Sequence, residues 1–469
     1  MSRAGAWIFV LLITLAVRVA SLSAYPLHDT TEARYSEIAR IMVVTNEWLI
    51  PQVAPGMPFW AKPPLSIWAT AASLKLFGAT EFAVRLPALL FSLAAMVIVY
   101  GFCARRYSAT TAWAAAAVFL SSGVGFVGAG AVMTDAALTL AVTVSVIAFA
   151  SRLGNSGGAS AIAFFLGLAL GLLAKGPVAI VLVAMPVALW SLRYRSLSWL
   201  WSFLPWFRGL GLVCLLALPW YFAAESRSPG FLNYFLIGEH FLRFVDSGWT
   251  GDLYGNAHDR PLGTIWLYGL MGLLPWSVIA GYATLRNWPR RLAGPEQGTE
   301  HEFFVLAALA PLLFFTLAGN VLPAYVMPTL PALSVLLGRW LAHRSRSWAS
   351  VAATVPALVL MLMYTGVLDL SNQKSQKSTL EALSAAGPEG PVFYFERMPY
   401  SASFYSNGAT TVIRDSAELD GMLSSLESGR LIVQSKHEGR LGPDALACMA
   451  LEGFSGDFSI FSFEPCVQR

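Results

Sequence analysis

The chain has 469 residues, of which 56% are hydrophobic and only 12% are charged, whereas a soluble protein of this size carries about 25% charged residues. Its 16 tryptophans and 29 phenylalanines are typical of side chains at the boundary between lipid and headgroups. The composition excludes an ordinary soluble protein and predicts an integral membrane protein. The net charge of +4 adds little, because the distribution of charge along the chain matters more in a membrane.

Apolar runs long enough to cross about 30 Å of hydrocarbon recur along the chain. The first is not followed by a convincing cleavage site, so we expect it to remain as a membrane span. We predict about eleven spans, at residues 4–22, 83–102, 109–125, 131–150, 160–174, 177–192, 209–224, 263–285, 302–318, 321–338 and 348–368.

Arginine occurs in each connection on one side of these spans, which predicts that this side is cytoplasmic. The longer segments 25–80 and 225–262 and the C-terminal tail then lie outside, in the periplasm if the organism is a bacterium. We expect a membrane domain at 1–370 and an external domain at 371–469. The arginines that set this orientation are Arg105, Arg106, Arg152, Arg193, Arg195, Arg208, Arg286, Arg290, Arg291, Arg339, Arg344 and Arg346.

The first external segment contains the charge-rich stretch YPLHDTTEARYSEIAR. Asp29 and Glu32 have the spacing of a helix N-cap and a capping box, and Glu37 and Arg40 fall on one face of the helix that follows. The opposite face is apolar and carries Ile38, Ile41, Met42 and Thr45. This pattern predicts an amphipathic helix on the membrane surface, with the two acids serving either as caps or in chemistry.

Charges inside or at the edge of a membrane are costly and usually functional. Asp135 is expected in the first turn of a span, where it could cap the helix or act in a cavity beside the small-residue run GVGFVGAG. Lys62, in AKPP, is expected at a rigid turn, where snorkelling to the interface is the alternative. Lys175, in AKGP, is a lone cation between two apolar spans and should attract an anion.

Two further external segments carry candidate ligand groups. In GEHFLRF, Glu239, His240 and Arg243 should share one helical turn, and an arginine suits bidentate phosphate recognition. Two adjacent metal-ligand types do not form a zinc motif. In LPAYVMP, the phenol of Tyr325 could bond to a ligand oxygen, or the residue could be an ordinary interfacial tyrosine.

From about residue 371 the composition becomes polar. PVFYFER, ATTVIRD, GRLIVQS and FSIFSFEP are expected as strands, with STLEALSAAG and SAELDGMLSSLESG as helices, which predicts a small α/β domain. Cys448 and Cys466 fall in this tail and could form a disulfide in an oxidising compartment. Cys103 and Cys214 are expected to be packing residues.

The external acids, lysines, arginine and tyrosine together suit a phosphate-bearing substrate that enters from the lipid, with cations holding the phosphate and a carboxylate accepting a proton. The chain has no Walker motif or glycine-rich phosphate loop, and we expect neither a cofactor nor a nucleic-acid partner. A transporter or flippase for a lipid-linked sugar and an assembly subunit are the alternatives. Charges at one face, away from the bilayer midplane, favour an enzyme.

The order of the motifs DxxEARY, KPP, an Asp at the start of a later span, AKGP, EHFLRF and LPAYVMPTLPAL resembles bacterial members of the protein O-mannosyltransferase superfamily. The resemblance is greatest to lipid A aminoarabinose transferases and related polyprenyl-phosphate glycosyltransferases of the GT-C fold. It implies inverting sugar transfer from an undecaprenyl-phosphate donor to a lipid or other acceptor at the periplasmic face of the bacterial inner membrane.

The resemblance also implies roles for individual residues. Asp29 or Glu32, together with Asp135, would supply the catalytic carboxylates. The donor phosphate would be held by Lys62, Lys175, Arg243 and Tyr325, and the cavity would also contain Arg34, Tyr35, Glu239 and His240.

The chain departs from these relatives at several positions. Thr31 stands where many relatives have the Asp of an Asp-Glu pair, so the base is open between Asp29 and Glu32. Ala61 and Gly238 replace a Glu and a His associated with a metal, and we therefore expect no metal. Asn320-Val321 replaces Ser-Lys, so the same sugar and acceptor do not follow.

Overall fold

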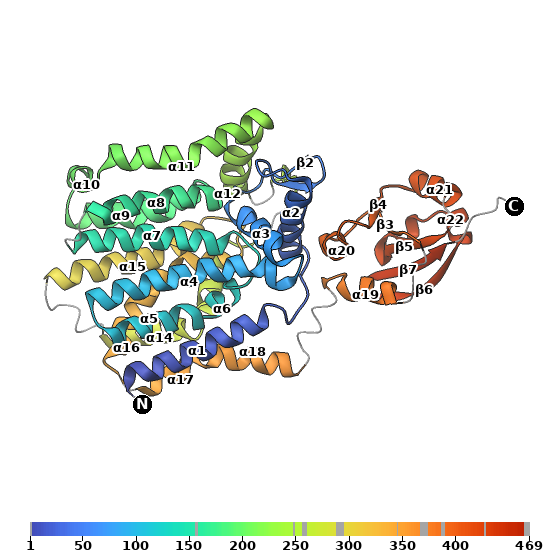
Figure 1. The fold of residues 1–469 in the computed structure, drawn as a ribbon. Coiled ribbons are helices and arrows are strands. Elements are labelled where there is room, and N and C mark those ends of the chain that lie inside the picture. The colour runs from blue at the N-terminus through green and yellow to red at the C-terminus, as the bar shows by residue number, and fades with distance from the viewer. Residues whose placement is uncertain are drawn as a thin grey trace.

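The apolar runs of the sequence form helices that lie side by side in one bundle (Figure 1). The structure, a computed structural model, describes residues 2–154, 158–246, 249–255, 260–287, 295–344, 346–365, 374–385, 390–425 and 428–463. The long bundle helices are α1 (Arg3–Ser21), α4 (Glu81–Arg106), α7 (Asp135–Leu153), α8 (Gly158–Lys175), α9 (Val178–Tyr194), α11 (Trp206–Arg227) and α15 (Pro295–Phe315). Shorter ones are α5 (Ala109–Ser121), α6 (Gly123–Gly128), α10 (Leu197–Phe203), α13 (Thr264–Gly272), α14 (Trp276–Asn287), α16 (Leu330–Ala342), α17 (Ala349–Ala352) and α18 (Thr354–Tyr364).

Each of the eleven predicted spans contains a helix, and the chain is a multi-pass membrane protein. Within the described ranges, five helices are long and apolar enough to cross a membrane unbroken. The number rises to seven if α9 with α10, bent by 118°, and α13 with α14, bent by 100°, are each counted as one span. Helices α5 and α16 have 13 residues each, or about 20 Å, so they are too short to cross alone. The 3₁₀ segment η3 (Pro323–Thr329) precedes α16.

Helix α7 lies in the interior of the bundle. In its most apolar window 72% of the residues are buried, compared with 33% in α11, and α7 packs against both α4 and α8. A Cβ on Gly167 of α8 would lie 2.6 Å from the carbonyl oxygen of Ala141 in α7. Only glycine permits this approach of the two backbones, which fixes the helix whose first residue is Asp135.

The external segments gather at one end of the bundle, opposite the end that holds the N-terminus (Figure 1). They form α2 (Thr31–Thr45), the short strands β1 (Gln52–Ala54) and β2 (Met57–Pro58), α3 (Leu65–Phe77), the π-helical η1 (Asn233–Leu242) and α12 (Arg243–Val245). The described parts of residues 25–80 and 225–262 therefore lie at the same end of the bundle.

Asp29 does not cap helix α2, which was one of the two roles that the sequence left open for this acid. The N-cap of the helix is Thr30, which makes no side-chain capping bond, because the carboxylate of Asp29 binds Ser401 instead. The polar face is also not solvated, since Glu37 is 2% exposed and α2 packs between α3 and the C-terminal domain. The helix therefore serves as an interface between two parts of the protein.

The C-terminal domain is a five-stranded mixed sheet of order β4-β3-β5-β7-β6. Strand β3 pairs in parallel with β4 and β5, and β7 pairs antiparallel with β5 and β6. The four predicted strands are β3 (Val392–Phe395), β4 (Thr411–Ile413), β5 (Gly429–Gln434) and β7 (Phe458–Phe463), and the two predicted helices are α19 (Lys377–Ala385) and α21 (Ser416–Ser425). Strand β6 (Met449–Ser455) and the short helices α20 (Tyr400–Tyr405) and α22 (Pro443–Ala447) were not predicted from the sequence, because their residues lack a clear period.

The cysteines divide between the two domains. Cys448 is disulfide-bonded, whereas Cys466, its expected partner, lies outside the described residues. Cys103 is a buried free thiol in α4, which confirms the prediction of a packing residue. Cys214 is a free thiol exposed on α11, on an apolar helix surface.

Candidate active site

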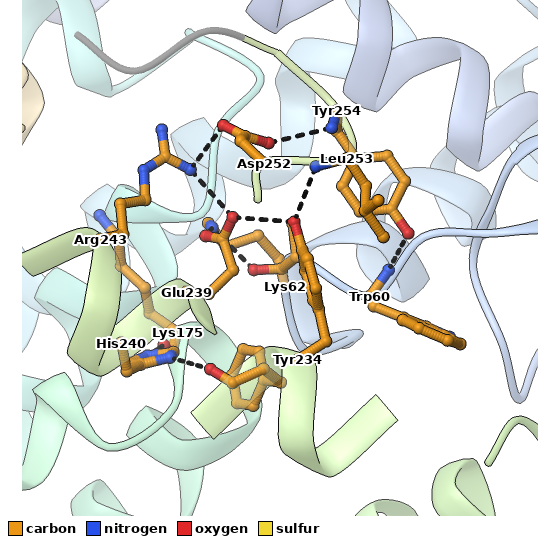
Figure 2. Close-up of polar contacts among 12 residues, drawn as sticks. Trp60, Lys62, Lys175, Tyr234, Glu239, His240, Arg243, Asp252, Leu253 and Tyr254 are labelled. Carbon is orange, nitrogen blue, oxygen red and sulfur yellow. Dashed lines mark hydrogen bonds and ion pairs between the residues drawn. The ribbon is translucent and has the colours of Figure 1, made fainter. Parts of the chain in front are cut away.

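Two cations at the end of the bundle that holds α2 and η1 are bridged by one buried carboxylate (Figure 2). Lys62 Nζ lies 2.8 Å from Glu239 Oε2, and Arg243 Nη1 lies 2.9 Å from Glu239 Oε1 and 3.3 Å from Asp252 Oδ2. The side chain of Glu239 is 2% exposed, whereas those of Lys62 and Arg243 are 17% and 19% exposed. The buried carboxylate therefore holds both cations in place, while part of each cationic side chain stays exposed to a ligand. We call Lys62, Glu239, Arg243 and Asp252 the charge tetrad.

Lys62 is held rigidly by the sequence around it. Two prolines follow it and lead directly into α3, whose N-cap is Pro64, so the local backbone has little freedom. The ammonium donates to the carbonyl oxygen of Ala61 at 2.7 Å and to Glu239. An ammonium has three donors, and within the described part of the chain the third has no partner.

Glu239 and Arg243 are oriented by the π-helical winding of η1. A π-helix bonds residue i to residue i+5, and the hydroxyl of Tyr234 accordingly lies 3.4 Å from Glu239 Oε1 (Figure 2). The sequence predicted these residues in one turn of an α-helix. The π-helical winding brings Tyr234, five residues before Glu239, to the carboxylate that Arg243 reaches from the ordinary i,i+4 position.

His240 connects η1 to the turn between α8 and α9. Its Nδ1 lies 2.8 Å from the carbonyl oxygen of Phe235 and its Nε2 lies 3.0 Å from that of Lys175. Gly176 permits this contact, because its φ is +85° and a Cβ there would lie 2.6 Å from the Phe235 ring. Both ring nitrogens therefore face backbone carbonyls. Across the described residues, no three His, Cys, Asp or Glu side chains are grouped as they would be around a metal ion.

The segment at 249–255 joins the tetrad to the first external segment. Asp252 Oδ1 accepts a hydrogen bond from the backbone N–H of Tyr254 at 2.9 Å. The hydroxyl of Tyr254 donates to the carbonyl of Pro58 at 2.8 Å and accepts from the N–H of Trp60 at 3.1 Å. Arg34 donates to the carbonyl of Tyr254 at 2.5 Å. One short segment thus fixes the position of Asp252 relative to α2 and Lys62.

A second ion pair lies where α7 and α8 meet. Lys175 Nζ lies 2.5 Å from Asp135 Oδ1 and 4.1 Å from the centre of the Tyr325 ring. Tyr325 is in electrostatic range of Lys62 and Arg243 as well as Asp135, so it lies near both this pair and the tetrad. Among the described residues, neither Asp135 Oδ2 nor the Tyr325 hydroxyl has a hydrogen-bond partner, and both are available to a ligand.

Glu32 forms a separate ion pair with a fully buried arginine. Arg85 Nε and Nη2 each lie 2.8 Å from the carboxylate of Glu32. The guanidinium also donates to the carbonyls of Leu22, Tyr25 and Pro26 and stacks on the Tyr25 ring at 3.8 Å. Both oxygens of Glu32 are therefore occupied in fastening the first external segment to α4.

Asp29 lies at the junction with the C-terminal domain. Its carboxylate accepts a bond from the N–H of Ser401 at 3.1 Å and a short one from the Ser401 hydroxyl. Around it, Ser403 bonds to Glu37 at 2.6 Å, and the hydroxyl of Tyr405 accepts from the N–H of Leu27 at 2.8 Å. Helix α20 thus grips the segment that leads into α2.

Arg34 and Tyr35 lie beside Lys62 on the side of the site that α2 forms. The Arg34 guanidinium lies 5.7 Å and 5.8 Å from the ring centres of Tyr35 and Phe59, and Tyr35 is in electrostatic range of Lys62. Tyr35 also lines an apolar pocket between α2, α3 and α4 that reaches Val132 and Met133. That pocket has no ion pair in its lining, so the tetrad and the Asp135–Lys175 pair remain the centre of the site.

Burial and charge have opposite effects on the carboxylates. Burial alone would raise the pKa of Glu239, but Lys62 and Arg243 outweigh it and lower this pKa to about 2. Although burial opposes it, Glu239 in turn raises the pKa of Lys62. Burial raises the pKa of Asp29 to about 6 despite the bonds from Ser401. Glu239 is therefore ionised throughout the neutral pH range, whereas Asp29 gains or loses its proton near pH 6.

The structure brings together six of the eleven predicted site residues around the tetrad and the Asp135–Lys175 pair. They are Lys62, Asp135, Lys175, Glu239, Arg243 and Tyr325. Arg34, Tyr35 and His240 support them, and Asp29 and Glu32 make other contacts. Asp252, Arg85, Tyr234 and Tyr254 were missed, although a lone arginine inside a predicted span is a usable signal for Arg85.

A family model for dolichyl-phosphate-mannose-protein mannosyltransferases matches residues 2–235. Two curated relatives, from Yersinia enterocolitica and Pseudomonas aeruginosa, are undecaprenyl phosphate-alpha-4-amino-4-deoxy-L-arabinose arabinosyl transferases. Each is 30% identical, over 72% and 75% of this chain respectively. The chain spans 59% and 62% of their lengths. The crystal structure of ArnT from Cupriavidus metallidurans bound to undecaprenyl phosphate superposes with a TM-score of 0.79, at 19% identity and 98% coverage of both chains.

The helical bundle and the C-terminal sheet together have the GT-C fold, and the fold match extends over 98% of the chain. Within this class, the matched family model and the curated relatives show that the chain is similar to the protein O-mannosyltransferase superfamily, and among its members to the undecaprenyl-phosphate aminoarabinose transferases. The resemblance deduced from the motifs is confirmed.

Proposed function

We propose that the protein is a membrane glycosyltransferase that moves a sugar, with inversion, from a polyprenyl-phosphate donor to a lipid or other acceptor. The observation that carries the proposal is the convergence of Lys62, Arg243, Lys175 and Tyr325 beside a carboxylate with a vacant oxygen. We further propose that this end of the bundle faces the periplasm from the bacterial inner membrane. The arginine-bearing connections and the shared external end of the bundle support that orientation.

The cations and the phenol would bind the donor phosphate. Within the described ranges, Lys62 has a third N–H without a partner and Arg243 keeps exposed surface, so both can donate to phosphate oxygens. Tyr325 and Lys175 lie next to each other, since Lys175 Nζ is 4.1 Å from the centre of the Tyr325 ring, and both can donate to the same phosphate. As the bond between the sugar carbon and the phosphate oxygen breaks, these donors would stabilise the charge that develops on the phosphate.

A carboxylate would accept the proton of the acceptor hydroxyl as its oxygen attacks the sugar carbon. Of the three predicted acids, Asp135 is the one with an oxygen free of hydrogen bonds to the described residues. Both oxygens of Glu32 and both of Asp29 are engaged. We therefore favour Asp135 as the base, with Glu32 and Asp29 as candidates that would first need to release their partners.

The remaining predicted residues would form and orient the cavity. Arg34 and Tyr35 would hold the wall beside Lys62, His240 would fix η1, and Glu239 would set the positions of both tetrad cations. The products would be the glycosylated acceptor and the polyprenyl phosphate, and the acceptor proton would leave through the base.

The test uses the full-length protein in detergent with a polyprenyl-phosphate sugar whose sugar is radiolabelled. Release or transfer of the sugar is followed for wild type, Asp135→Asn, Lys62→Ala and Arg243→Ala. We expect Asp135→Asn to lose at least about a hundredfold in kcat, with little change in donor affinity. Lys62→Ala and Arg243→Ala should instead weaken donor binding.

Three results would contradict parts of the proposal. Donor binding without any sugar release by the wild type would favour a flippase, which needs no base. Full activity of Asp135→Asn would remove it as the base and return the role to Glu32 or Asp29. Unchanged donor affinity in both cation variants would refute the phosphate site.

A further inference from the structure

We infer that Glu239 and Asp252 make the phosphate site selective for a singly charged phosphodiester, the donor, over a doubly charged phosphomonoester, the spent carrier lipid. The two carboxylates would thereby promote release of the product. This inference rests on the proposed function and adds to it a role for two acids that do not take part in bond making.

The charges in the site balance. Two cations, Lys62 and Arg243, face two carboxylates, Glu239 and Asp252, within 3.3 Å, so the tetrad carries no net charge. The neighbouring pair of Lys175 and Asp135 is neutral as well. A site made only to bind phosphate as tightly as the chemistry allows would leave such cations unpaired.

The two acids cannot move out of the way easily. The side chains of Glu239 and Asp252 are 2% and 7% exposed. Tyr234 lies beside Glu239, and the backbone N–H of Tyr254 holds Asp252. Glu239 also stays ionised, because its pKa of about 2 lies far below neutral pH. A bound phosphate therefore meets two fixed negative charges behind the two cations.

The reaction changes the charge of the phosphate. In the donor, phosphorus carries two ester bonds, one to the lipid and one to the sugar, and a single negative charge. When the sugar–oxygen bond breaks, the bonding electrons stay on the phosphate oxygen, while the acceptor proton goes to the base. The product is a monoester, whose second pKa is about 6, so it carries close to two negative charges at neutral pH. The acids repel the single charge of the donor as well, but they repel the two charges of the product about twice as strongly.

The experiment compares two lipid probes of equal chain length, a polyprenyl phosphate and its methyl diester. Their affinities are measured from the intrinsic tryptophan fluorescence of the full-length protein in detergent at pH 7.5. The variants are Glu239→Gln and Asp252→Asn, which remove one charge each at nearly constant shape. Glu239→Asp keeps the charge, and Glu381→Gln removes an exposed charge, 67% exposed, in the C-terminal domain.

We expect Glu239→Gln to bind the monoester roughly tenfold to a hundredfold more tightly and the diester much less so. Asp252→Asn should act in the same direction, while Glu239→Asp and Glu381→Gln should keep the wild-type ratio of the two affinities. In turnover, Glu239→Gln should show stronger inhibition by added polyprenyl phosphate and a lower kcat without a higher KM for the donor.

The inference is overturned if Glu239→Gln and Asp252→Asn change both affinities by the same factor, or weaken both. In that case the acids only shape the site. A wild-type protein that binds neither probe would contradict the proposed function itself, so the two failures are distinguishable. Thermal unfolding of each variant separates loss of the fold from loss of selectivity, because an unfolded variant binds neither probe.

Discussion

Removing the carboxylate of Glu32 should destabilise the protein strongly, independently of any part it takes in catalysis. Glu32→Ala deletes two 2.8 Å bonds to Arg85, whose side chain is 0% exposed. Breaking a buried ion pair by removing one partner costs about 3–5 kcal/mol. Arg85 keeps three carbonyl acceptors and the face of Tyr25, so we expect the lower end, about 3 kcal/mol.

The assay is unfolding in mixed micelles, followed by tryptophan fluorescence. Glu381→Ala is the matched control, because its carboxylate is 67% exposed and lies 3.9 Å from Lys377, a pair worth about 0–1 kcal/mol. The double variant Glu32→Leu/Arg85→Met should be more stable than Arg85→Met alone, which leaves the carboxylate of Glu32 without its partner. If Glu32→Ala costs no more than Glu381→Ala, the Arg85 pair does not fasten the first external segment.

The remaining predictions concern the C-terminal interface and the α8–α9 turn. The pKa of Asp29 is raised from 3.8 to about 6 in the folded protein, so the native state binds the proton more tightly and stability should fall as the pH rises from about 4 to about 6; Asp29→Asn should flatten this part of a stability–pH curve. Gly176→Ala should cost about 1–3 kcal/mol, because φ is +85° and the new Cβ would meet the Phe235 ring, whereas Gly211→Ala, which meets nothing within 4 Å, should be neutral or stabilising in thermal unfolding. Lys377→Ala removes the 2.6 Å ion pair to Glu81 and should raise the rate of hydrogen–deuterium exchange in α20 but not in α21. An equal change of the exchange rate in both helices would show that the pair does not hold the C-terminal domain against the bundle.

The sequence was informative about features that depend on a single segment of the chain. Hydropathy placed the helices, and proline punctuation placed Lys62 and Tyr325, because each depends on neighbours in the chain. Because an unpaired charge in a membrane is costly, the sequence predicted that Lys175 attracts an anion. The carboxylate of Asp135 lies 2.5 Å from Lys175 Nζ.

Contacts between distant segments could not be predicted in the same way. The partner of Asp29 is Ser401, 372 residues away, and a capping pattern at the start of α2 is compatible with either use of the acid. Asp252 lies in a polar loop where nothing local distinguishes it, and its pairing with Arg243 depends on how 249–255 folds back over η1. The sequence identified the charged residues that matter but not which carboxylate pairs with which lysine or arginine.

The π-helical winding of η1 makes the site sensitive to chain length as well as to side-chain identity. A π-helix has more residues per turn than an α-helix, and in η1 this winding lets Tyr234 reach Glu239, five residues later, on the side where Arg243 binds the same carboxylate. Leu236 and Ile237 on its surface are 39% and 50% exposed, so shortening the segment there by one residue would disturb little packing. Such a deletion would rotate the residues that follow it by about 100° about the helix axis. Arg243 would then be misaligned, although every residue of the site would still be present.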